Sequence, residues 1–223
     1  MSLQFPIPQM LNKRSTPDMI ASALRDAIFQ GYLPSGSPLK QVEIAKHFGV
    51  SPAPVREAFQ KLVAEGLAET RHNRGVAVAP LSESDIVDIA ELRILLEAHA
   101  FRRSAPHLTE GDFVKAEDIV RRAETAVDRD TQASLHWDFH RTIYQKAQRP
   151  RLVAQIDLLF VNMNRYLMPT LMMRDHWQES HLRLVSAFRC SDVEAAVALN
   201  TEQIQQAVDR VLMYLHDREH RRS

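Results

Sequence analysis

The chain has 223 residues, of which 45% are apolar and 25% are charged, and its formal net charge is zero. These values are typical of a globular protein with one large domain or two small ones, and they argue against bulk, charge-driven nucleic-acid binding. The single cysteine, Cys190, excludes an internal disulfide, and no apolar run reaches the 18 residues of a membrane span.

The charges are unevenly distributed along the chain. Residues 1–80 hold nine basic and six acidic residues, whereas the remainder holds 19 basic and 22 acidic residues. The excess of basic over acidic residues in residues 1–80 places any nucleic-acid contact in this segment, although a random fluctuation would give a similar split. The first ten residues, MSLQFPIPQM, lack the basic start and apolar run of a signal peptide, so we expect a cytoplasmic protein.

The N-terminal elements begin with an arm and a helix. Residues 1–14 are Pro-rich and non-periodic, which predicts a flexible arm. Thr16 is a suitable N-cap, and Pro17 and Asp18 suit the first helical turn. Apolar residues then repeat at helical spacing until Gly31, and the following LPSGSP is a predicted loop.

Two further helices and a hairpin follow this loop. A short helix is expected over residues 41–48 and is ended by Gly49. Ser51 caps a third helix that begins at Pro52, and two short strands are predicted at 67–71 and 76–79. This order of elements is that of a winged helix-turn-helix, which we place at residues 15–80.

The second half of the chain carries a helical pattern only. Six helices are predicted, over residues 84–103, 110–129, 131–147, 151–167, 175–188 and 193–216. The loops between them are short, so neighbouring helices are expected to be antiparallel. The fold class is therefore mainly α, with an all-α antiparallel bundle of about six helices at residues 84–217.

The helix-turn-helix predicts a face for DNA. A recognition helix presents its N-terminal side chains to the major groove, and Arg56 lies opposite the buried stripe of that helix, where it could read a guanine or contact a phosphate. A solvated pairing of Arg56 with Glu57 or Gln60 is the alternative, and the wing arginines could be ordinary surface charge. The predicted DNA contacts are Lys46, Ser51, Arg56, Lys61 and, on the wing, Arg71, His72 and Arg74.

The stretch GVSPAPVREAFQKLVAEGLAETRHNRGVAV resembles the GntR family of bacterial regulators, whose usual pattern is GVSRxPVREALxxLxxEGLV…RGxxV. The resemblance covers residues 39–81. Pro52 stands where the family usually has an arginine that commonly reads a base, which puts the sequence preference in doubt. Arg56 keeps the second arginine of the pattern.

The helical half resembles the FCD effector domain of the FadR-like branch of that family. The matching pieces are ELRILLEAHA at 91–100, HWDFHRTIYQKA at 136–147 and HLRLVSAFRCSDVEAA at 181–196. Six helices suit the VanR-like version of this domain. The Gly-Asn pair that usually follows the second piece is replaced by Gln148-Arg149.

Three histidines form a candidate metal site. His136 and His140 are four residues apart and so share one helical face, where two imidazoles can bind one divalent ion. His181, on a later helix, could complete a three-histidine set. No HExxH motif is present and Asp138 points away from the pair, so no general base is provided for a metalloprotease. An exposed histidine pair without a role is the alternative.

The family resemblance implies a fourth ligand position and an effector. The family has Asp, His, His and His where this chain has His136, His140, His181 and Gln203. Zinc or nickel without a ligand carboxylate would keep its full charge and attract an anion, whereas a site that has lost the metal could bind the acid directly.

Arg93 matches the pocket arginine of the family and is surrounded by apolar residues. Its partner is either the carboxylate of a small organic acid or Glu97, one turn further on. Tyr144, Asn162 and Arg165 are further candidates for lining the same cavity, with surface or core packing as their alternative.

The function implied is a dimeric transcription regulator, most commonly a repressor in this family, that binds a palindromic operator in double-stranded DNA and responds to an organic acid. A metal-dependent hydrolase or lyase built on the histidines is one alternative. A helical adaptor that binds protein through its wing is another.

Overall fold

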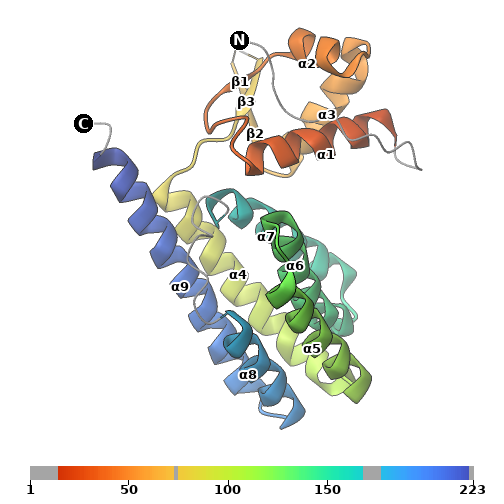
Figure 1. Ribbon diagram of the computed structural model, residues 1–223, viewed down its shortest axis with the longest axis vertical. Helices are drawn as coiled ribbons and strands as arrows, with labels where there is room; N and C mark the ends of the chain where they lie inside the picture. The colour runs from red at the N-terminus through yellow and green to blue at the C-terminus, as the bar shows by residue number, and fades with distance from the viewer. Residues whose placement is uncertain (1–14, 73–74, 168–176, 221–223) are drawn as a thin grey trace. The chain divides into compact units, whose positions relative to one another are not determined.

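A computed structural model describes residues 15–72, 75–167 and 177–220. The chain divides into two compact units, Met1–Ser82 and Glu83–Ser223 (Figure 1). The arm predicted at residues 1–14 lies outside the described residues. No described helix is long and apolar enough to cross a membrane.

Three helices form the core of the first unit: α1 (Thr16–Phe29), α2 (Gln41–Phe48) and α3 (Pro52–Ala64). The N-cap of α1 is Ser15 rather than the expected Thr16, because the Ser15 hydroxyl accepts from the Asp18 backbone N–H. Gly49 ends α2 in the left-handed conformation with φ of 67°, which glycine adopts without strain. The stripe predicted on α3, at Val55, Ala58, Phe59 and Leu62, is buried.

The wing is a three-stranded antiparallel sheet in the order β1-β3-β2. Strands β2 (Ala68–Arg71) and β3 (Gly75–Val78) are the two predicted from sequence. Strand β1 (Pro38–Leu39) was missed, because these two residues follow the LPSGS loop and are a strand only through pairing with Ala77 and Val76 of β3.

The second unit contains the six predicted α-helices, two of which continue into short 3-10 helices at 105–107 and 145–147. The bounds are α4 (Glu83–Ser104), α5 (Glu110–Thr125), α6 (Arg129–Tyr144), α7 (Pro150–Leu167), α8 (Trp177–Arg189) and α9 (Val193–His220). Helix α4 packs along α9 and α7, while α5 packs against α6 and α8 (Figure 1).

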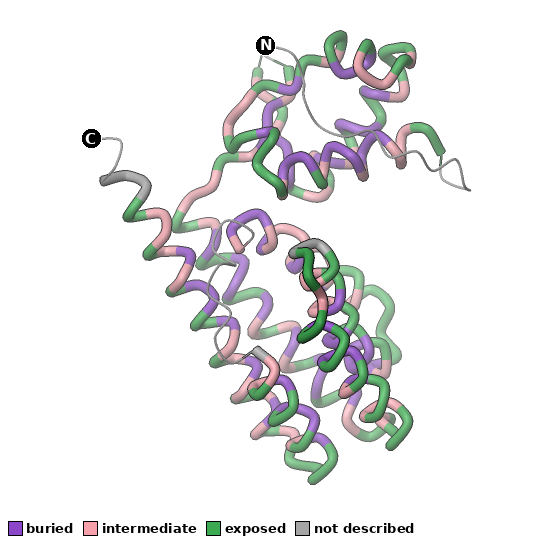
Figure 2. Tube along the Cα trace, viewed as in Figure 1, coloured by how far each residue is buried: buried purple, intermediate pink, exposed green. Residues whose placement is uncertain are grey.

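The bundle core is rich in aromatic rings. Phe101 of α4 stacks on Tyr144 of α6 and makes an edge contact with Phe188 of α8, with ring centroids 5.4 and 4.9 Å apart. Figure 2 shows the buried residues following the inner sides of the helices. Polar side chains are buried in the same interior, and they define the candidate effector site.

Gln148 has an unusual backbone conformation after α6. Its φ is 53°, in the left-handed region that favours glycine. This accounts for the glycine that the family usually carries near this turn, and it identifies Gln148 as a position of local backbone strain.

Candidate functional site

The exposed face of α3 carries the predicted DNA-reading residue. Arg56 is exposed, and its neighbours Val55 and Phe59 are buried, so the side chain projects away from the core. Arg56 makes no ion pair within the described part of the chain, and neither Glu57 nor Gln60 bonds to it. The Ser51 hydroxyl makes no capping hydrogen bond, and the Pro52 carbonyl accepts from Gln41 Nε2 at 2.7 Å, which ties α3 to α2.

The two lysines of the predicted set differ in their surroundings. Lys46, near the end of α2, is exposed. Lys61 forms an ion pair with Asp18 of α1. Lys61 therefore has an internal role that the sequence analysis did not assign to it, and Lys46 is the lysine that is left open to solvent.

The wing residues predicted to contact DNA differ in whether they bond to other residues of the chain. Arg71 donates from Nε to Glu69 at 2.8 Å and from Nη1 to the Gly36 carbonyl at 3.3 Å. His72 is exposed. Arg74, the third predicted wing contact, lies outside the described residues.

The three histidines come together inside the helical unit. His140 Nε2 lies 3.2 Å from His136 Nε2 and 3.2 Å from His181 Nε2. His140 and His181 are buried, and His136 is half-buried. Helix α6 supplies the first two residues at the predicted i, i+4 spacing, and the packing of α8 brings in the third.

This geometry fits a tetrahedral metal. Nitrogens bound at about 2.0–2.1 Å to a tetrahedral zinc lie about 3.3–3.4 Å from one another. The two nitrogen pairs that include His140 are 3.2 Å apart, and all three ligand atoms lie within 4.8 Å of one another. Without a metal, a neutral imidazole that carries its proton on Nε2 can donate to the lone pair of a neighbouring ring, so the same contacts are compatible with hydrogen bonds between the histidines. The donor set therefore fits zinc or nickel.

The surroundings favour neutral imidazoles. Burial is the main cause that holds the pKa values of His136 and His140 well below the ordinary 6.5, and repulsion from the other histidines adds to it. The positive charge of Arg93 lowers both pKa values further, and Arg210 of α9 lowers that of His136. Neutral histidines are the form that binds a metal.

A hydrogen-bonded network lies behind His140. The fully buried Glu97 carboxylate accepts from Arg93 Nε at 2.6 Å, from the Tyr144 hydroxyl at 2.6 Å and from Asn200 Nδ2 at 2.8 Å. Of the two partners expected for Arg93, the described residues provide Glu97. Among the described residues, Arg93 Nη1 contacts the weakly accepting sulfur of Met163, at 3.1 Å, and no strong acceptor.

This network orients the His140 ring. Burial and the nearby Glu97 raise the pKa of Tyr144 well above its usual value, so the hydroxyl keeps its single proton. That proton is donated to Glu97, so the oxygen can only accept from His140 Nδ1, 3.3 Å away. The contact thus favours the tautomer with the proton on Nδ1, which leaves the Nε2 lone pair of His140 directed toward the other histidines.

Helix α9 carries three polar residues on one face, and two of them act on this region. Asn200 binds Glu97, and Arg210 acts electrostatically on His136. The buried Nε2 of Gln203 has no hydrogen-bond partner among the described residues, as expected of a group that awaits a ligand. Sequence reasoning missed Asn200 and Arg210. Their spacing from Gln203 along one face of α9 was the available signal.

Two predicted effector residues have other partners. Arg165 is buried and forms an ion pair with Asp85 of α4 at 3.2 Å. Asn162 donates to the Leu158 carbonyl of its own helix at 3.0 Å. These contacts give Arg165 a structural role between α7 and α4.

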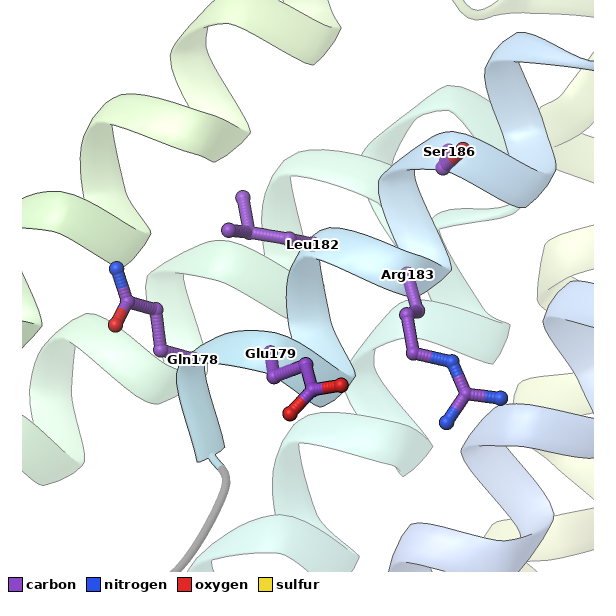
Figure 3. Close-up of a pocket in the computed structure, with 5 residues that line it drawn as sticks. All are labelled: Gln178, Glu179, Leu182, Arg183 and Ser186. Carbon is purple, nitrogen blue, oxygen red and sulfur yellow. The ribbon is translucent and has the colours of Figure 1, made fainter.

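An open depression runs along the outer side of α8. It is lined by Gln178, Glu179, Leu182, Arg183 and Ser186 (Figure 3). His181 is buried whereas Leu182 and Arg183 are exposed, so the depression and the histidines lie on different faces of α8.

Comparison with known families assigns both units. The family model "Bacterial regulatory proteins, gntR family" matches residues 16–78, and the model "FCD domain" matches residues 88–206, more than half of the chain.

Two curated relatives are transcriptional repressors by name. One, of Paenarthrobacter nicotinovorans, is a probable D-xylose utilization operon transcriptional repressor. It is 34% identical over 201 residues, covering 83% of this chain and 85% of the relative. The HTH-type transcriptional repressor RspR of Escherichia coli K12 is 28% identical over 199 residues, covering 84% and 85%.

Solved structures agree with these relatives. A GntR family member from Pseudomonas syringae pv. tomato DC3000 is 32% identical, covers 93% of this chain and 89% of that one, and has a TM-score of 0.58. E. coli McbR/YncC, at 21% identity, shares the fold with a TM-score of 0.77 over 91% of this chain and 100% of that one. Both units therefore match transcription regulators rather than hydrolases or lyases. The chain belongs to the GntR family of transcription regulators and joins a winged helix-turn-helix to an FCD effector domain.

Proposed function

We propose that this regulator is a cytoplasmic homodimeric repressor whose FCD domain senses a small carboxylate through a divalent metal, zinc or nickel. The observation that carries the proposal is the convergence of three histidine nitrogens within 4.8 Å of one another, two pairs of them at 3.2 Å, under the positive charge of Arg93 and Arg210. Neutral histidines would bind the metal and leave its charge uncompensated, which favours an anionic effector.

The ligand set consists of His136, His140 and His181, with Gln203 at the fourth position. The buried Nε2 of Gln203 has no hydrogen-bond partner among the described residues, and rotation of the amide would present its carbonyl oxygen at the same place. Amide oxygen is a weak ligand, so an effector carboxylate could take its place. Arg93 would then hold the carboxylate through the end of its guanidinium that Glu97 does not occupy.

The low pKa values of the histidines weigh against the metal-free alternative. Binding an acid without metal would rely on protonated histidines, and burial disfavours that form at neutral pH. Effector affinity that rises as the pH falls toward 6 would support the metal-free mode, whereas metal binding weakens under the same change.

The DNA contacts follow from the exposed face of α3. Arg56 is proposed to read a base in the major groove, with Lys46 and Ser51 on phosphates. Arg71, His72 and Arg74 of the wing are proposed to approach the minor groove. Lys61 is retained as a phosphate contact only if DNA binding releases it from Asp18.

Regulation requires that the effector distinguish two arrangements of the DNA-binding units. Two copies would present two recognition helices to a palindromic operator, with half-site spacing set by the dimer. An effector that binds one arrangement more tightly shifts the population toward it and thereby changes operator affinity. Operator binding must then change the effector affinity by the same factor.

The effector site is tested by metal analysis and by thermal shift. We expect purified protein to bind about one zinc or nickel ion per chain and to gain stability with a subset of organic acids only when metal is present. His140→Ala should lose both responses. Retention of metal content and acid binding by His140→Ala would refute the proposed site.

The DNA site is tested independently with Arg56→Ala. The substitution should weaken specific operator binding by about 1–3 kcal/mol at matched salt, with metal content unchanged. Val42→Ala, at an exposed position on α2, is a control for helix substitutions near this surface. Unchanged affinity of Arg56→Ala would remove Arg56 from the interface.

A further inference from the structure

Helix α4 has an exposed face that runs the length of the helix, opposite the face that carries Arg93 and Glu97. Residues at spacings of three and four form this face, and they include Asp88, Glu91, Leu92, Leu95, His99 and Arg103, all exposed. The neighbouring helices α7 and α9 therefore leave one complete side of α4 uncovered within the described residues.

The centre of this face is apolar. Leu95 is 68% exposed and Leu92 is 48% exposed. Two adjacent leucines in solvent lose the hydrophobic contribution that burial would give them, whereas single exposed apolar residues are common. An apolar centre with a charged rim is the arrangement found at protein interfaces.

The charges on either side of this centre have opposite signs. Asp88 and Glu91 lie in the N-terminal half of the face, and neither makes an ion pair among the described residues. His99, Arg102 and Arg103 lie in the C-terminal half. Arg102 binds Glu194 of α9, with two contacts of 2.7 Å, while Arg103 is exposed.

Such a face complements an antiparallel copy of itself. A two-fold axis at Leu95 places Leu95 against its own copy, Leu92 near Ala98, and Glu91 near His99. Asp88 then approaches the basic end at Arg102 and Arg103. A parallel copy would instead place acids against acids, which costs free energy.

We propose that α4 forms the two-fold contact between two copies of this chain, with Leu95 on or beside the symmetry axis. This inference rests on the proposed homodimer and adds the surface through which it forms. The contact is isologous, so each residue pair occurs twice and closes the assembly at two subunits. Because Glu97 and Arg93 lie on the reverse side of the same helix, the contact would also link the effector sites of the two subunits.

A cysteine placed on the axis tests this geometry directly. The full chain contains only Cys190, which is exposed, so the background variant is Cys190→Ser. Leu95→Cys in that background should form a covalent dimer under mild oxidation, because a residue on a two-fold axis meets its own copy within disulfide reach. Val114→Cys on α5, 51% exposed and away from the face, is the matched control and should stay largely monomeric on denaturing gels.

Charge substitutions supply the equilibrium test by light scattering. Leu95→Arg should raise the dimer dissociation constant by about 100-fold or more, since it places two like charges at the centre of the contact. Glu91→Lys and His99→Glu should each weaken the dimer, and the double variant should restore it. Circular dichroism and metal content report whether each variant is folded.

The outcomes separate the two proposals. A wild-type dimer with no preferential cross-linking of Leu95→Cys, and with Leu95→Arg still dimeric, overturns the α4 contact and leaves the homodimer standing. A wild-type protein that stays monomeric at micromolar concentration, with and without DNA, refutes the homodimer itself.

Discussion

Removal of the Tyr144 hydroxyl tests the network behind the histidines. In Tyr144→Phe the ring keeps its stacking with Phe101, whose centroid lies 5.4 Å away, so little apolar packing is lost. Glu97 loses a donor at 2.6 Å and His140 loses the acceptor of its Nδ1 proton at 3.3 Å. The substitution therefore has two separable consequences, one for stability and one for metal affinity.

The stability cost follows from the burial of Glu97, whose side chain has 0% exposure. A hydrogen bond to a buried charged group contributes about 1.5–3 kcal/mol. Arg93 and Asn200 still bind the carboxylate, so we expect a loss of about 2 kcal/mol in the free energy of unfolding. The metal affinity should fall about 10–100-fold, the usual effect of removing a group that orients a metal-binding histidine.

Denaturant unfolding of the metal-free protein measures the first effect, and competition with a chromophoric zinc chelator measures the second. Tyr166→Phe is the matched control, because Tyr166 is also buried and donates to a carboxylate, that of Asp85, at 2.5 Å. The control should lose stability but keep its zinc affinity. Equal zinc affinities for Tyr144→Phe and Tyr166→Phe would refute the orienting role of Tyr144.

Two further measurements follow from the same structure. The folded state holds the pKa values of His136 and His140 below 6.5. The metal-free protein should therefore be most stable above that pH and should lose stability as the pH falls from about 7 to 5. A denaturation midpoint that stays constant as the pH falls over this range, or that rises, would contradict this prediction. Gln148→Gly should stabilise the bundle by up to about 1 kcal/mol in urea unfolding, because it relieves a left-handed φ of 53°, and a destabilised variant would show that the Gln148 side chain outweighs the strain.

The sequence predicts the helices of both units well, because their caps and apolar spacings are local features. Ser51, Pro52 and Gly49 mark the turn between α2 and α3 without reference to the rest of the fold. Strand β1 depends on pairing with β3, which is distant in the sequence, and was therefore missed. Helix α5 ends at Thr125, four residues earlier than expected, since Asp128 caps the next helix through the Thr131 N–H.

The candidate site was predictable where it lies on one helix. The i, i+4 spacing places His136 beside His140, and the same spacing allows Arg93 to reach Glu97. The sequence leaves open whether Glu97 or a ligand holds Arg93. The structure adds Tyr144 from α6 and Asn200 from α9, and both donate hydrogen bonds to the Glu97 carboxylate that Arg93 also contacts. Interactions between helices that are distant in sequence, including the effect of the Arg210 charge on the pKa of His136, need the packed bundle.

The most direct test of the account measures operator affinity and effector response together. Fluorescence anisotropy with the DNA upstream of the chain's own gene would be recorded for metal-loaded wild type, His140→Ala and Arg56→Ala, each with and without the organic acid that gives the largest thermal shift. We predict that the acid changes the operator affinity of wild type at least about fivefold, an ordinary allosteric coupling. His140→Ala should bind the operator without responding to the acid, and Arg56→Ala should bind metal and acid but bind the operator about 1–3 kcal/mol more weakly. An acid response that survives in His140→Ala would contradict the central claim that the histidine cluster couples the effector to DNA binding.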